Sequence, residues 1–155
     1  MKTSCCALGI LLCVSAGLAL SAFAQGSHEK YLTAADVEKV TGVRGVTSIA
    51  RGSAAGAGGD LNFADDAGEL VLMVQFADVK NFAGFKTKYG KAPVSGVGEQ
   101  AIEGGSMPGM PDNLLAFTKG THCVVLTAFG DFATRKVYLT IDQLTSLGKV
   151  IASRL

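Results

Sequence analysis

The chain has 155 residues, of which 14 are lysine or arginine and 13 are aspartate or glutamate. This length is enough for one domain with its own hydrophobic core. The formal net charge of +1 gives no electrostatic basis for binding to nucleic acid or to an anionic membrane surface, because both depend on clustered lysines and arginines.

The first 24 residues have the pattern of an export signal. Lys2 is their only charged residue, Ala7–Leu20 forms an apolar segment, and Ala22 and Ala24 are the small residues that a signal peptidase reads. We therefore expect cleavage after Ala24 and a periplasmic or secreted location in a bacterium. Since the leader holds one lysine and no acid, the rest of the chain has no formal net charge.

Cysteine usage changes on export. Cys5, Cys6 and Cys13 lie in the expected leader, so that only Cys123 remains and no disulfide can form within the domain. Two alternatives remain open. Cleavage could occur before a lipidated Cys13, although a leucine precedes it where a small residue is preferred, or the leader could stay as a membrane anchor.

A helix is predicted over residues 34–41. Thr33 is a suitable N-cap, and Asp36 stands where an acid can reach back to the cap amide. Gly42 offers a left-handed end to the helix.

The same capping pattern recurs at Thr140 and Gln143, which predicts a C-terminal helix. Leu144, Leu147 and Ile151 would lie on one face of that helix. We expect this face to cover the strand that contains the apolar run 70–74.

Between these helices, short apolar runs separated by turn residues predict strands and one more helix. The expected strands are Val46–Arg51, Leu61–Ala64, Glu69–Phe76, Gly96–Ile102, Asn113–Phe117 and Thr121–Phe129, and the middle helix is 79–89.

The element order is therefore α-β-β-β-α-β-β-β-α. The connections within the strand runs are too short for parallel crossovers, which predicts an α+β domain with an antiparallel sheet of about five to six strands and helices packed on one face. We expect residues 25–31 to form a flexible arm and residues 32–155 to form this single domain.

Two short motif matches lack the context that their chemistry requires. Gly96–Ala101 fits a dinucleotide-binding pattern, but the glycines at 104 and 105 prevent the helix that should follow. Asp60–Asp66 resembles the start of a calcium loop without the later ligands. Cys123 lies in an apolar run and is expected to be a core residue. We therefore expect no cofactor and identify no catalytic residues.

The segment from Glu103 to Asp112 is the candidate contact surface. Its Met107-Pro-Gly-Met110 sequence could touch a partner through soft apolar side chains, together with Glu103, Ser106 and Asp112. The alternative is that Met107 and Met110 are thioether ligands of Cu(I).

The chain resembles small exported bacterial domains of unknown function, many of them lipoproteins. The resemblance lies in the segments LTAADVEKVTG and GVGEQA and in the closing hairpin and helix. The resemblance implies an α+β fold in the cell envelope and carries no catalytic residues. The leading hypothesis is an exported, non-catalytic binding module for a small ligand or an envelope protein. The alternatives are a small envelope enzyme with an unrecognised site and a structural protein that associates through a sheet edge.

Overall fold

The structure is a computed structural model that describes residues 28–54, 58–105, 112–131 and 133–155.

Local capping signals determine where two of the helices begin. In α1 (Ala34–Thr41), the Thr33 hydroxyl accepts the Asp36 amide at 3.2 Å, and the Asp36 carboxylate accepts the Thr33 amide at 2.9 Å. Thr140 and Gln143 exchange the same pair of bonds at the start of α3 (Ile141–Arg154). Both predicted helices are confirmed.

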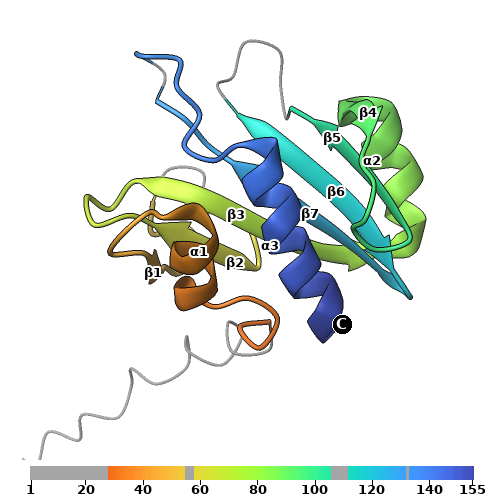
Figure 1. Ribbon diagram of the computed structural model, residues 1–155, viewed down its shortest axis with the longest axis horizontal. Helices are drawn as coiled ribbons and strands as arrows, with labels where there is room; N and C mark the ends of the chain where they lie inside the picture. The colour runs from red at the N-terminus through yellow and green to blue at the C-terminus, as the bar shows by residue number, and fades with distance from the viewer. Residues whose placement is uncertain (1–27, 55–57, 106–111, 132) are drawn as a thin grey trace, which may run out of the picture.

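Seven antiparallel strands form one sheet in the order β1-β2-β3-β7-β6-β5-β4 (Figure 1). The strands are β1 (Thr47–Ser48), β2 (Leu61–Ala64), β3 (Leu70–Asp78), β4 (Gly90–Pro93), β5 (Gln100–Gly104), β6 (Asn113–Lys119) and β7 (His122–Ala128). A short 3-10 turn, η1 (Val79–Asn81), leads from β3 into α2 (Phe82–Tyr89). The α+β class with an antiparallel sheet is confirmed.

The expected number of strands was too low. The additional strand is β4, which follows α2 and pairs with β5 at the edge of the sheet. Its sequence contains Gly90 and Pro93, which do not favour strand formation. An edge position tolerates a proline, because the outer side of an edge strand needs no ladder hydrogen bond.

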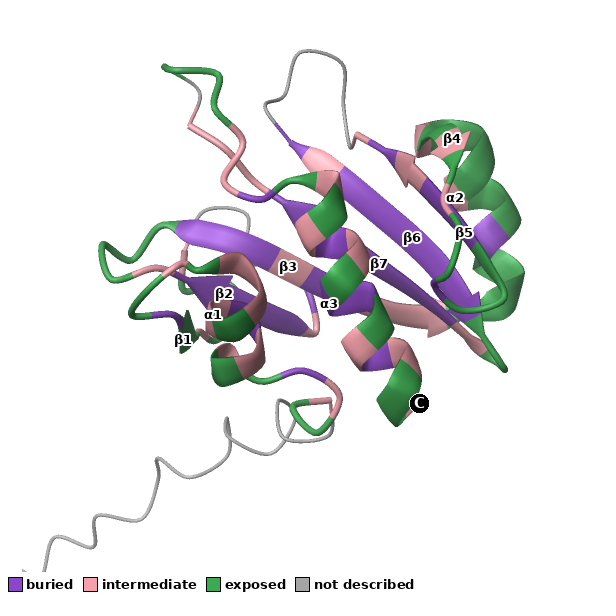
Figure 2. Cartoon of the chain, viewed as in Figure 1, coloured by how far each residue is buried: buried purple, intermediate pink, exposed green. Residues whose placement is uncertain are grey.

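Helices cover both faces of the sheet, so the expectation of helices on one face was also wrong. The apolar runs in β6 and β7 occupy consecutive positions, and successive side chains of a strand point to opposite faces. Leu115 and Phe117 therefore pack into the core beneath α3, whereas Leu114 and Ala116 pack with Phe82 of α2 on the other face. Figure 2 shows the buried centre of the sheet between these layers.

Helix α3 lies chiefly over β6 and β7. The expectation that it would cover the 70–74 segment of β3 was therefore wrong. Gly148 permits the close approach of α3. A Cβ atom at this position would lie 2.9 Å from Leu115 Cδ2 and 3.0 Å from Val97 Cγ1. Leu144, Leu147 and Ile151 are fully buried at this contact, as the helical spacing predicted.

The two ends of the described chain meet beside α1. Arg154 makes two hydrogen bonds to the Asp36 carboxylate, at 2.6 and 2.8 Å, and a third to the Tyr31 carbonyl at 3.3 Å. The His28 ring stacks on Phe76 of β3 with 4.4 Å between the ring centroids. In the described part of the expected arm, residues 28–31, the side chains of His28 and Tyr31 thus pack against β3. No helix in the described ranges is long and apolar enough to span a bilayer.

Candidate functional site

A long connection follows the central strand β7. The described residues of the segment 129–138 form a loop that folds back on itself, since Gly130 bridges Val137 and the Tyr138 amide donates to the Phe129 carbonyl at 2.9 Å. Most connections between elements of a compact domain are shorter than this one, and long ordered loops are often functional. We call it the 129–138 loop.

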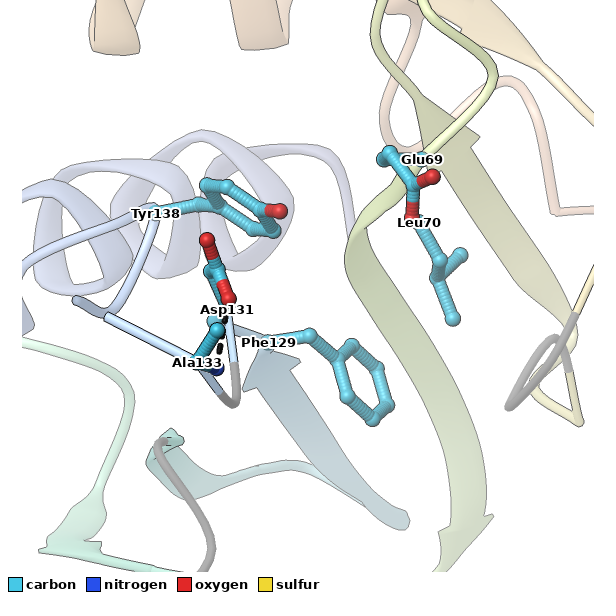
Figure 3. A pocket seen from close by; sticks show the side chains of 7 residues that line it. Glu69, Leu70, Phe129, Asp131, Ala133 and Tyr138 are labelled. Carbon is cyan, nitrogen blue, oxygen red and sulfur yellow. Dashed lines mark hydrogen bonds between the residues drawn. The ribbon is translucent and has the colours of Figure 1, made fainter. Parts of the chain in front are cut away.

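A hollow of about 660 Å³ lies between this loop and the start of β3. Figure 3 shows Glu69 and Leu70 on one wall and the side chains of the 129–138 loop on the facing wall. The described residues that line the hollow are Glu69, Leu70, Phe129, Gly130, Asp131, Ala133 and Tyr138. Its volume is within the range of small-molecule sites.

Three of the apolar side chains that line the hollow are buried or half-buried. Leu70 is buried, and Phe129 and Tyr138 are half-buried. The Phe129 amide donates to the Val71 carbonyl at 3.3 Å, which ties the loop to β3. The apolar part of the hollow is therefore formed by side chains whose backbones are held by the sheet.

Acidic side chains stand on both walls. Oδ1 of Asp131 accepts the Ala133 and Thr134 amides at 2.7 and 3.3 Å, and these bonds lower the pKa of the Asp131 carboxyl. Oδ1 of Asp65 accepts the Glu69 amide at 2.9 Å, which fixes the turn that presents Glu69. Both carboxylates that line the hollow therefore come from ordered turns.

The pKa of Tyr138 is raised by its surroundings in the hollow. Burial raises the pKa of its phenol, and the negative charges of Glu69, Asp131 and Asp65 raise it further. Each of these charges opposes formation of a phenolate, so together they make the electrostatic potential at the hydroxyl more negative. Among the described residues lining the hollow, the only two with a formal charge at neutral pH are Glu69 and Asp131.

The residues predicted from the sequence are only partly described. Glu103 is half-buried in β5, between its partners Ala92 and Leu115. Asp112 is buried just before β6. Ser106, Met107 and Met110 lie outside the described residues, so the contact-loop and copper hypotheses both stay predictions. Within the described ranges, no group of three or more His, Cys, Asp or Glu residues could hold a metal ion.

The two short motif matches have structural explanations. Gln100 begins β5 two residues after Gly98, the last glycine of the Gly96–Ala101 motif, so the helix of a dinucleotide site does not form. In the calcium-like segment, the Asp60 carboxylate accepts the Phe76 amide at 2.7 Å. The Asn62 side chain is buried and bonds to the backbone of Gly59. These side chains hold the loop before β2 in place.

Cys123 packs in the core cluster between the sheet and α2. Burial raises the pKa of its thiol to about 11, so that the reactive thiolate is scarce at neutral pH. This agrees with the expectation of a core cysteine.

Sequence reasoning did not identify the hollow. Glu69 and Asp131 are distant in the sequence and meet because β3 pairs with β7, with Leu72 opposite Ala128. The available signal was the long segment between β7 and α3, which carries three aromatic residues and an acid without a helical or strand pattern.

No known protein family, curated protein or solved structure matches the chain. The chemistry of the hollow is therefore inferred from its own geometry.

Proposed function

We propose that the chain is an exported binding module that holds a small ligand in the hollow between β3 and the 129–138 loop. The observation that carries this proposal is a concave site whose apolar walls are held by the sheet and whose two acidic residues belong to hydrogen-bonded turns. Few side chains would need to be ordered on binding, and the entropic cost of association is correspondingly small.

Export rests on the leader, from Lys2 to Ala24. Mass spectrometry of the protein recovered from its native host should give an N-terminus at Gln25, with or without cyclisation to pyroglutamate. An intact Met1 would contradict cleavage, and an acylated Cys13 would show a lipoprotein instead.

Binding in the hollow can be tested with a fragment library and ligand-observed NMR. Ala133 is exposed and lines the hollow, so Ala133→Trp should fill it with little effect on folding. Ala83→Trp, at an exposed position on α2, is the matched control. We expect fragments that bind the native protein to bind the Ala83 variant and not the Ala133 variant. Fragments that bind all three proteins equally would place the site elsewhere.

Association through a sheet edge, the structural alternative, has little support in the described strands. At one edge β1 has only two residues, and at the other β4 carries Lys91, Pro93 and a register shift. Short edges, charged residues, prolines and bulges all hinder pairing with another chain.

A protein partner remains a second proposal for the segment from Glu103 to Asp112. Strand β5 ends and β6 begins at the same end of the sheet as the hollow. A partner bound to this segment would therefore approach the sheet from the hollow's end.

A further inference from the structure

We propose that the ligand of this hollow is a small organic cation, with an ammonium or guanidinium group joined to a flat apolar body. This inference rests on the proposed function and adds the chemical class of the ligand. The charge and the aromatic walls of the hollow support it separately.

The charge of the hollow favours a cation. Glu69 and Asp131 lie on opposite walls of the hollow, on different elements, so that a positive group between the walls would be attracted from both sides (Figure 3). Both amides that bond to Asp131 contact Oδ1, at 2.7 and 3.3 Å. A carboxylate has about four acceptor positions, so Asp131 can accept a further hydrogen bond from a cationic ligand while the loop amides stay bonded. Charge-assisted bonds of this kind are among the strongest in proteins.

The walls favour an organic ligand over a metal ion. Phe129, Tyr138 and Leu70 supply two ring systems and an aliphatic side chain, which suit the apolar part of a molecule. Aromatic faces also attract ammonium and guanidinium groups. Calcium, by contrast, takes about six to eight oxygen ligands, whereas the described lining offers two carboxylates.

The experiment compares three ligands with the same phenyl ring, by isothermal titration calorimetry at pH 7 and low ionic strength. The ligands are 2-phenylethylamine, which is a cation, 2-phenylethanol, which is neutral, and 3-phenylpropionate, which is an anion. We expect the amine to bind about ten-fold or more tightly than the alcohol, and the carboxylate to bind more weakly than either. The preference for the amine should shrink as salt is added, because salt screens exposed charges.

Two variants test whether the two acids cause this preference for the amine, and a third variant is their control. Glu69→Gln and Asp131→Asn each remove one charge, and the asparagine keeps an oxygen for the loop amides. Each should weaken binding of the amine several-fold and leave binding of the alcohol unchanged. Asp66→Asn is the matched control, because Asp66 is an exposed acid of the same turn as Glu69 and does not line the hollow. Thermal melts verify that all three variants fold.

The outcomes separate this inference from the proposed function. If the alcohol or the carboxylate binds as tightly as the amine, and Ala133→Trp abolishes that binding, the hollow is a binding site and the cation preference is wrong. If neither the three ligands nor any library fragment binds in the hollow, both proposals are overturned. If Asp66→Asn weakens the amine as much as Glu69→Gln, a general field rather than the hollow attracts the cation, and the inference fails.

Discussion

Replacement of Leu147 by alanine tests whether α3 secures the domain. Leu147 is 0 % exposed and lies between two other fully buried residues of the same face, Leu144 and Ile151. The change removes three buried carbon atoms, worth about 2.4 kcal/mol at about 0.8 kcal/mol for each buried methylene. The cavity left in a close-packed core adds to this cost, and measured losses for such changes are about 2–5 kcal/mol. We expect a loss of about 3–4 kcal/mol in the free energy of unfolding.

Urea denaturation followed by circular dichroism measures this loss directly, provided that the slope against urea is the same in both proteins. A domain of this size has a total stability of about 5–15 kcal/mol, so the variant should still fold. Its melting temperature should fall by about 10 °C. Lys149→Ala, at an exposed neighbour on the same helix, should change stability by less than about 0.5 kcal/mol.

A second variant gives a stability loss with which that of Leu147→Ala can be compared. Thr140→Ala removes the side-chain cap of α3 and nothing from the core, so its cost should be about 1 kcal/mol. A loss for Leu147→Ala below that of Thr140→Ala would refute the reasoning, because a fully buried leucine cannot contribute less than an exposed cap. A large loss for Lys149→Ala would place the wrong face of the helix in the core.

Three further predictions concern charge, the thiol and the glycines. Hydrogen bonds from Arg154 lower the folded-state pKa of Asp36 below its ordinary 3.8, so this pair adds stability above about pH 4 and loses it as the pH falls further. Arg154→Gln should cost about 1 kcal/mol or less at pH 7, and urea titrations at pH 7 and 3 should show the difference from the native protein shrinking. Cys123 should react slowly with a thiol reagent in the native state and rapidly in denaturant; equally rapid labelling in both would contradict its burial. Gly98→Ala should destabilise the fold by about 2 kcal/mol or more, because its φ of +57° is left-handed and a Cβ would strike the backbone of β6. Gly84→Ala, with no atom within 4 Å of a Cβ on α2, should instead gain about 0.5–1 kcal/mol in thermal melts.

Features that depend on a few neighbouring residues were predictable from the sequence. The caps at Thr33 and Thr140 act within three residues, and the structure shows both reciprocal pairs of hydrogen bonds. The buried face of α3 follows from helical spacing alone. These signals need no knowledge of what the rest of the chain does.

Features that depend on pairing between distant segments were not predictable. Strand β4 exists because β5 offers a free edge, and its own residues include Gly90 and Pro93. The face taken by α2 depends on which side of β6 the other helices leave uncovered. The hollow has the same origin, since Glu69 and Asp131 become neighbours only when β3 and β7 pair. No local pattern contains that information.

The bonds from Arg154 to Asp36 and Tyr31 have a geometric consequence for attaching the protein to a surface. They bring both ends of the described chain to the C-terminal end of α3, whereas the hollow lies near the N-terminal end of that helix. The 14 residues of α3 separate these two places by about 21 Å, at about 1.5 Å for each residue. A tether joined near either end of the described chain, whether a lipid, a bead or a fused protein, would therefore be attached about one helix length away from the hollow.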